Sequence, residues 1–184
     1  MSTHPPLPHR VAGDLALDLA NTISWRGTRR EVDHIAGASD IVAWARAAGL
    51  VERSYTLPDA SQDALVADVH RLRAAIMDAG AAVAAGSAPR EEALATIREM
   101  AALSLAAASL NGLPATLTFA PGDRIVGPLA WAALDLFRGG ELDRVKQCPP
   151  DDCRWLFLDR TKNRSRRWCD MATCGNREKA RRSR

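Results

Sequence analysis

Residues 148–174, CPPDDCRWLFLDRTKNRSRRWCDMATC, hold all four cysteines of this 184-residue chain. Cys148 and Cys153 form one C-x4-C pair, Cys169 and Cys174 form a second, and 15 residues separate the two pairs. Two cysteine pairs at this separation are typical of structural zinc sites, in which each pair holds one side of a tetrahedral ion. The spacing therefore predicts one structural Zn²⁺ ion bound by four thiolates.

Two other uses of paired cysteines compete with zinc. Disulfides form in oxidising compartments, but the first ten residues lack the apolar core of a secretion signal, so we expect a cytoplasmic protein. A redox dithiol usually shows the tighter C-x-x-C spacing beside an α/β pattern. Zinc is therefore the favoured interpretation, while iron stays open because it also accepts four thiolates.

The residues around the cysteines indicate how the ligands are held. The Pro-rich turn at 148–153 can present backbone amides to thiolate sulfur, and 155–159 has the pattern of a strand that is apolar on both faces. Residues 160–167 turn the chain back towards Trp168 and Cys169, and 171–182 suits a helix with Cys174 in or near its first turn. The positive end of the helix dipole favours thiolate there. This order of turn, β-hairpin and helix predicts a treble-clef-like zinc module.

Four thiolates fill the coordination sphere of Zn²⁺ and leave no position for a substrate or an activated water, so we expect a structural metal. A module of this size builds little apolar core by itself, and a zinc site supplies on the order of 10 kcal/mol of folding free energy. We therefore expect the residues after 143 to lose their structure without metal, while the preceding residues stay folded.

Charge divides the chain at the same place. Residues 1–143 carry 12 Lys and Arg against 17 Asp and Glu, a net of −5, whereas residues 144–184 carry 13 against 5, a net of +8. We expect two domains, a helical one over 1–140 and a zinc module over 141–184. No apolar run reaches the roughly 20 residues that span a bilayer, which disfavours a membrane protein.

The acidic part has the pattern of a mainly α fold. Leu65, Val69, Leu72 and Ile76 step by 4, 3 and 4 residues, which makes one apolar stripe on a helix. After the break at 86–89 we expect a second long helix, and the alanine-rich sequence around the break favours an antiparallel pair. Shorter elements are expected at 14–23 (helix, with a strand as the alternative), at 39–49 (helix with Ser39 as N-cap), at 113–119 (strand) and at 129–137 (helix buried nearly all round).

Residues that could carry chemistry are sparse in the acidic part. Asn21, Thr22 and Arg26 form a polar group after an apolar stretch. They either line a small-molecule pocket or cap a helix and satisfy backbone groups, and the second alternative is the more common. The sequence shows no nucleophile beside a base, no acid–base pair and no Gly-rich phosphate loop, so we expect a protein that is not an enzyme.

Arginine dominates the charge of the cysteine-containing part. On a helix, Arg177, Arg181 and Arg184 step by 4 and 3 and share one stripe, next to the basic loop at 160–168. Such a surface is typical of contact with a phosphate backbone. The alternatives are a solvated basic tail and a tail that docks on the acidic part. The expected nucleic-acid contacts are Arg160, Lys162, Arg164, Arg166, Arg167, Arg177, Lys179, Arg181 and Arg182.

Several motifs match those of known families, namely CRWLFLD at 153–159, Asn163, RRWCDM at 166–171, CGNR at 174–177, LDLANT at 17–22 and SDIVAW at 39–44. The first four resemble the CGNR zinc finger, and the last two resemble the ABATE domain that precedes that finger. Together the resemblance covers nearly the whole chain. It implies metal ligands at all four cysteines, a family regarded as stress-induced bacterial transcription regulators, and a finger that acts as the DNA-binding element.

Three functions are compatible with the sequence. In the favoured hypothesis the helical domain senses a small-molecule effector or mediates assembly, and the zinc module binds duplex DNA, with a homodimer reading two half-sites. Duplex DNA is favoured over single strands because Trp155, Phe157 and Trp168 are assigned to packing rather than to base stacking. The second hypothesis is a zinc module that binds another protein without contacting DNA. The third and least favoured is an enzyme with its pocket around Asn21.

Overall fold

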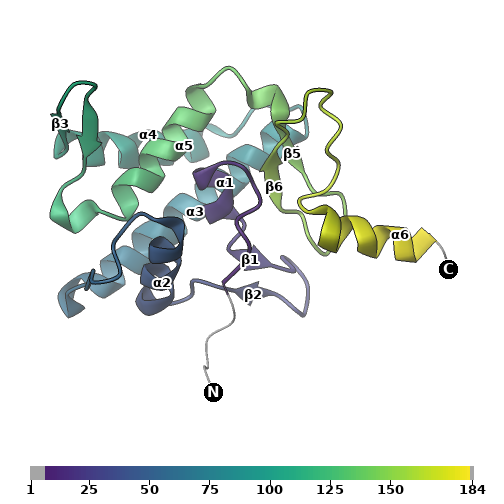
Figure 1. Cartoon of the computed structure of the whole chain (residues 1–184), viewed down its shortest axis with the longest axis horizontal. Helices are drawn as coiled ribbons and strands as arrows, with labels where there is room; N and C mark the ends of the chain where they lie inside the picture. The colour runs from purple at the N-terminus through teal and green to yellow at the C-terminus, as the bar shows by residue number, and fades with distance from the viewer. Residues whose placement is uncertain (1–6, 183–184) are drawn as a thin grey trace.

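The computed structural model describes residues 7–182, which form a mainly α-helical fold. The long helix α3, Gln62–Ala84, runs through the middle and is contacted by the four other helices of the N-terminal part (Figure 1). Within the described range, three strand pairs complete the fold, and no helix has the length and apolar content needed to cross a membrane. The bounds are α1 Leu15–Ala20, β1 Ile23–Ser24, β2 Val32–Asp33, α2 Ala38–Ala48, α4 Glu91–Ala106, β3 Ser109–Asn111, β4 Thr116–Thr118, α5 Val126–Arg138, β5 Val145–Gln147 and β6 Leu156–Leu158, with short 3-10 turns at 59–61, 121–123 and 142–144.

Helix α1 begins where Asp14 caps it. The Asp14 carboxylate accepts hydrogen bonds from the backbone N–H groups of Ala16 (2.9 Å) and Leu17 (3.3 Å), donors that the first turn of a helix leaves unpaired. Leu17 and Leu19 are fully buried. The helical interpretation of this segment is therefore confirmed, and its strand alternative is wrong.

Helix α2 ends at Gly49, as predicted, with this glycine in the left-handed conformation (φ 77°). The predicted N-cap at Ser39 is wrong, because the cap is Gly37. The Gly37 N–H donates to the Asp40 carboxylate (3.2 Å). An acidic side chain in the first turn thus supplies the capping contact that the sequence pattern assigned to serine.

Helices α3 and α4 pack against each other after a short connection, as expected for the antiparallel pair. The predicted stripe of Leu65, Val69, Leu72 and Ile76 is buried along its whole length. Ile97 of α4 is buried as well. The core of the protein is therefore built around the facing sides of these two helices.

Two predicted elements differ in the structure. Helix α5 buries one face that includes Leu129 and Ala133, whereas Asp135 is exposed, so the prediction that it is buried nearly all round is wrong. The helix contacts α1, α3 and α4, and apart from Asp135 and Arg138 the residues outside its buried face are half-buried. Residues 113–119, expected as a single strand, contribute β4 to a hairpin whose first strand, β3, has no counterpart among the predicted elements.

The C-terminal part contains the expected β-hairpin and helix, but the hairpin has a different partner strand. β6 pairs antiparallel with β5, and the cysteine turn 148–153 joins them. We expected β6 to pair with the returning segment at 168–169, and this is wrong. That segment stays irregular because Arg166 donates to the carbonyls of Trp168 (3.0 Å) and Cys169. One wide helical turn, Met171–Gly175, then leads into α6, Asn176–Arg182.

Strand β6 joins the zinc module to the helices, because its two faces have different neighbours. Leu156 and Leu158 belong to the main apolar core, whereas Phe157 packs with the four cysteines. At Gly80 of α3, a Cβ atom would lie 2.6 Å from Cδ1 of Leu156, so the helix and the strand meet at a glycine. The predicted strand with two apolar faces is thereby confirmed.

Candidate metal centre and nucleic-acid interface

The four cysteine sulfurs form one compact cluster. All four Sγ atoms lie within 4.8 Å of one another, and the cysteines are buried. The Sγ of Cys169 is 3.6 Å from the Sγ of Cys153 and 3.6 Å from that of Cys174. A tetrahedral zinc ion with Zn–S bonds of about 2.3 Å holds its sulfurs about 3.8 Å apart. The cluster therefore fits one zinc ion, with Cys148, Cys153, Cys169 and Cys174 as ligands.

Local hydrogen bonds fix the cysteines in this arrangement. The Cys148 N–H donates to the Trp155 carbonyl (2.8 Å), and the Cys153 N–H donates to the Pro150 carbonyl (2.9 Å), which closes the turn. The Cys169 N–H points at the Sγ of Cys148 (3.4 Å). Backbone amides thus both shape the turn and stabilise thiolate charge.

Arginine adds positive charge to this centre. Arg177 donates to the Sγ of Cys174 (3.5 Å) and to the Asp152 carboxylate (3.0 Å). Without the metal, hydrogen bonds from the thiols of Cys148, Cys153 and Cys169 lower the pKa of Cys174, and the Arg177 charge lowers it further. Since four thiolates around Zn²⁺ leave a net charge of about −2, the guanidinium offsets part of it.

The side chain of Asn21 joins the N-terminal helical part to the zinc module, and we call the contact between these two parts the seam. Its Nδ2 donates to the Leu156 carbonyl and its Oδ1 accepts from the Leu156 N–H, both at 2.8 Å. The amide thus makes the two backbone hydrogen bonds that a neighbouring strand would make with β6. The Trp155 indole N–H donates to the Ile23 carbonyl (2.9 Å), and the Leu158 N–H donates to the Ala12 carbonyl (2.8 Å).

The predicted pocket residues make intramolecular hydrogen bonds. Besides Asn21, Thr22 is fully buried, donates to the Leu19 carbonyl (2.8 Å) and accepts from Arg73 (3.1 Å). Arg26 donates to the Ala20 carbonyl at 3.4 Å. These contacts favour the alternative in which the three side chains satisfy backbone groups, and the pocket around them stays a prediction.

A cavity that the sequence did not indicate lies at the seam. It has a volume of about 180 Å³, and most of its wall is apolar. Trp25 and Trp155 line it together with Arg177 and three of the cysteines. Trp25 has a left-handed backbone (φ 57°), a costly conformation for a bulky residue that is retained where surrounding contacts hold it.

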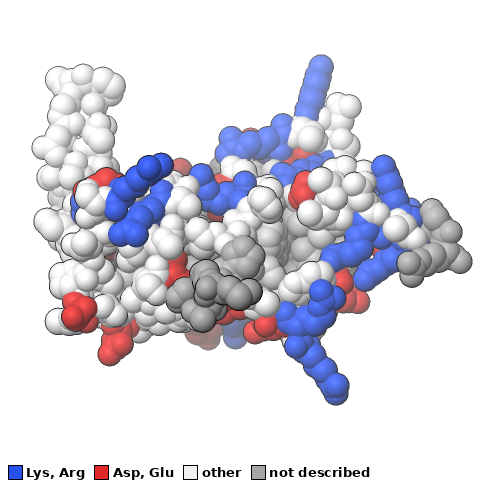
Figure 2. All heavy atoms as spheres, turned by 60° about the horizontal axis from the view of Figure 1, so that its bottom comes forward, with Lys and Arg blue, Asp and Glu red and all other residues white. Residues whose placement is uncertain are grey.

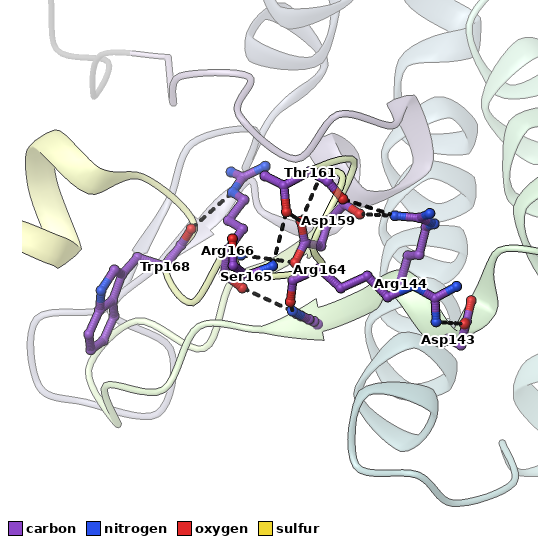
Figure 3. A network of polar contacts seen from close by, with 9 residues as sticks. Asp143, Arg144, Asp159, Thr161, Arg164, Ser165, Arg166 and Trp168 are labelled. Atoms are coloured by element: carbon purple, nitrogen blue, oxygen red, sulfur yellow. Dashed lines mark hydrogen bonds and ion pairs between the residues drawn. The ribbon is translucent and has the colours of Figure 1, made fainter.

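The basic loop at 160–168 is held by one buried carboxylate (Figure 3). Asp159 is fully buried, and one of its oxygens accepts from the Lys146 ammonium (2.6 Å) and the Arg166 N–H (3.0 Å). The other oxygen accepts from the N–H (3.0 Å) and hydroxyl (2.6 Å) of Thr161. Burial alone would raise the pKa of Asp159, but the hydrogen bonds from Lys146 and Thr161 hold it well below its ordinary value. The loop that carries the arginines therefore has a defined conformation.

Two of the predicted nucleic-acid contacts have structural roles. The Arg166 guanidinium lies 4.5 Å above the Phe157 ring and also donates to the Val11 carbonyl (2.7 Å). Arg177 is half-buried against the zinc centre and stacks on Trp25 at 5.0 Å. The geometry favours these two side chains as braces of the module, with little surface left for a phosphate.

The other predicted contacts are exposed. Arg164 pairs with Asp143, Arg181 with Asp152 (3.3 Å) and Arg182 with Glu178 (3.2 Å). Exposed ion pairs of this kind contribute little, so such side chains can exchange a carboxylate for a phosphate. The exposed set is Arg160, Lys162, Arg164, Arg167, Lys179, Arg181 and Arg182. Figure 2 shows Lys and Arg gathered over the half of the molecule that carries α6.

Sequence reasoning missed two further arginines at this surface, Arg29 and Arg30 of the β1–β2 loop. Both are exposed, and Arg30 stacks on Trp25 at 4.1 Å, the same ring that Arg177 contacts. The cluster was visible as RGTRR at 26–30, but it was masked by the net negative charge of the N-terminal part. Through Trp25, the loop thus places Arg30 beside the zinc module.

Comparison with family models agrees with the site and the fold. The model described as CGNR zinc finger matches residues 144–184, and the ABATE model, described as "Putative stress-induced transcription regulator", matches residues 13–140. The protein belongs to the ABATE family, and its residues 144–184 form a CGNR zinc finger, which makes it a zinc-binding regulator. Its cysteine cluster holds one structural zinc ion. No curated protein matches the chain.

Proposed function

We propose that this zinc-binding regulator contacts duplex DNA through a basic surface that the zinc module shares with the β1–β2 loop. The proposal rests on one juxtaposition. Arg30 from the N-terminal part and Arg177 from the finger both stack on Trp25, so two segments that are about 150 residues apart meet at one ring. The exposed arginines on either side of that ring then form one surface for phosphates.

The zinc ion and Asp159 would prepare this surface for binding. The metal fixes the turn and the start of α6, and the buried carboxylate fixes the loop that carries Arg160 and Arg167. A cationic surface held in one conformation loses little entropy when it meets a regular phosphate backbone. The proposal therefore predicts affinity that comes mainly from phosphate contacts and falls steeply with salt.

Duplex rather than single-stranded DNA is proposed because the aromatic side chains of the finger are already used. Phe157 is fully buried among the cysteines, and Trp155 donates its indole N–H to the body. Trp168 is half-buried next to Arg167. Side chains engaged in this way offer little ring surface for base stacking.

The remaining parts of the proposal follow from the family and from the closed metal site. Four thiolates fill the zinc coordination sphere, which supports binding rather than catalysis. On the family description we propose a transcription regulator whose production is induced by stress, and we further propose that it works in the bacterial cytoplasm. The helical domain would sense an effector or mediate assembly, and the seam cavity offers a small molecule contact with both parts.

Fluorescence anisotropy with a random-sequence DNA duplex tests the proposal. The zinc-loaded protein should bind with an affinity that falls steeply between low and physiological salt, and chelation of the metal should abolish binding. Salt-insensitive binding, or none with zinc in place, would overturn the proposal. A stable protein partner in that case would support the alternative of a protein-interaction module.

A further inference from the structure

A segment at the end of the molecule opposite the zinc module carries no charge and exposes several leucines. Residues 100–122 contain no Asp, Glu, Lys or Arg, although 26% of the whole chain is charged. This segment forms the end of α4 and the β3–β4 hairpin. Figure 1 places the hairpin and α6 at opposite ends of the molecule, and in Figure 2 the end remote from α6 carries a projection without charge.

Leucines are the main feature of this segment. The exposed fractions are 71% for Leu103, 69% for Leu110 and 98% for Leu113. Leu110 lies opposite Leu117 in the hairpin, so the two share one face, and Leu113 lies in the turn between the strands. The leucine face is defined here as Leu110, Leu113 and Leu117.

The opposite face of the hairpin is polar, and its side chains form hydrogen bonds with one another. Asn111 donates to the hydroxyls of Ser109 (3.2 Å) and Thr118 (3.3 Å), and Thr116 lies on the same side. A two-stranded hairpin is marginally stable in water unless one of its faces packs on something. The leucine face is packed only in part, since Leu117 is half-buried whereas Leu110 and Leu113 remain exposed.

We propose that the leucine face is the interface of a homodimer, in which the hairpins of two copies pack against each other about a two-fold axis. In a two-fold contact each group near the axis meets its own copy, so any charge there would face a like charge. An uncharged stretch of 23 residues meets this requirement, whereas it offers nothing to a charged partner.

A stable dimer needs more surface than the leucine face alone. A stable interface buries roughly 800 Å² per partner, which three leucines alone do not supply. The exposed end of α4, with Leu103, Ala106 and Ala107, has to contribute as well. Because the hairpin lies far from α6, such a dimer leaves both basic surfaces open.

Analytical ultracentrifugation of the zinc-loaded full chain tests this interface. The wild type should dimerise reversibly between about 1 and 300 µM. The double variant Leu110→Lys/Leu113→Lys should dimerise at least tenfold more weakly, because it places lysines against their own copies across the axis. Thr116→Lys adds a charge to the polar face of the same hairpin and should leave the dimerisation constant unchanged.

Three results would overturn the proposal, namely a wild type that is monomeric throughout, a double variant that dimerises normally, and loss of the dimer in Thr116→Lys. At concentrations where both proteins are monomeric, the double variant should keep the wild-type melting temperature, because the replaced side chains are exposed. It should also bind a short DNA duplex with the wild-type salt dependence. Failure of DNA binding in the wild type would therefore concern the proposed function and leave the dimer test intact.

Discussion

Asp159 shows how one buried residue shapes the candidate interface. Its carboxylate accepts four hydrogen bonds, which come from Lys146, Thr161 and Arg166. The sequence offered no sign of this role, because Asp159 was expected only as the end of a strand. Its partners lie on another strand and across the loop, so their convergence depends on the folded chain.

Replacing Asp159 with Asn should destabilise the protein by about 2 kcal/mol at pH 7, because Lys146 loses its carboxylate partner, although it keeps the carbonyls of Arg164 and Arg166 and reaches solvent. The folded-state pKa of Asp159 is lowered, so its contribution is present above the ordinary pKa of about 3.9 and is lost as the pH falls below that value. Urea unfolding from pH 7 to pH 3 should therefore show a smaller loss of stability in Asp159→Asn than in the wild type.

The control for this prediction is Asp143→Asn, which removes an exposed ion pair and should change stability by less than about 0.5 kcal/mol. Equal stability of Asp159→Asn and wild type at pH 7 would contradict this role.

Asn21 has a role like that of Asp159, because it is a buried side chain that holds two segments together at the seam. Asn21→Ala should lower the free energy of unfolding by about 2–4 kcal/mol, because it leaves the buried N–H and carbonyl of Leu156 without partners. Denaturant unfolding measures the loss, and hydrogen exchange at the Leu156 amide should accelerate. The exposed loop residue Asn163 provides the control, since Asn163→Ala should be close to neutral. An unchanged exchange rate at Leu156 would show that the seam does not depend on Asn21.

At the scale of elements, the periodic patterns were the most predictive. The stripe on α3 and the two-faced strand β6 were correctly anticipated, because each is set by local spacing and by burial on known faces. The sequence patterns did not predict the capping residue of α2, the outer face of α5 or the existence of β3. These depend on which neighbour covers an element, and a single sequence does not supply that information.

The contact between α3 and β6 makes Gly80 a sensitive position. Gly80→Val should destabilise the protein by about 1–3 kcal/mol, because Leu156 is fully buried and cannot move away from the new side chain. Thermal unfolding measures the effect. Gly140→Val is the matched control, as nothing lies within 4 Å of a Cβ at that position. If both variants unfolded alike, the close packing of β6 on α3 would be refuted.

At the scale of the whole molecule, the cysteine spacing correctly indicated the metal centre, but it overstated the independence of the zinc module. Val145, Leu156 and Leu158 belong to the main core, so β5 and β6 are part of the helical body as well as of the finger. The cysteines, by contrast, form a second cluster with Phe157. The expectation that everything after residue 143 depends on zinc therefore has to be narrowed.

Removal of zinc should disorder the cysteine turn, the basic loop and α6, while β5 and β6 keep their protection. The reason is that the leucines of β6 remain buried against α1 and α3 without the metal. Hydrogen exchange before and after chelation distinguishes the two regions. Rapid exchange throughout β6 in the metal-free protein would support the original expectation that all residues after 143 need zinc. Full protection of α6 in the metal-free protein would contradict a structural role of zinc in this helix.

The central claim is that one basic surface, built jointly by the zinc module and the β1–β2 loop, binds duplex DNA. The most direct test is the salt dependence of DNA binding in Arg29→Ala/Arg30→Ala, compared with Arg71→Ala/Arg98→Ala on exposed faces of α3 and α4. Loss of two phosphate contacts should reduce the slope of log K against log salt by roughly 2 in the first variant, and the slope should stay unchanged in the second. A wild-type slope in Arg29→Ala/Arg30→Ala would contradict the joint surface.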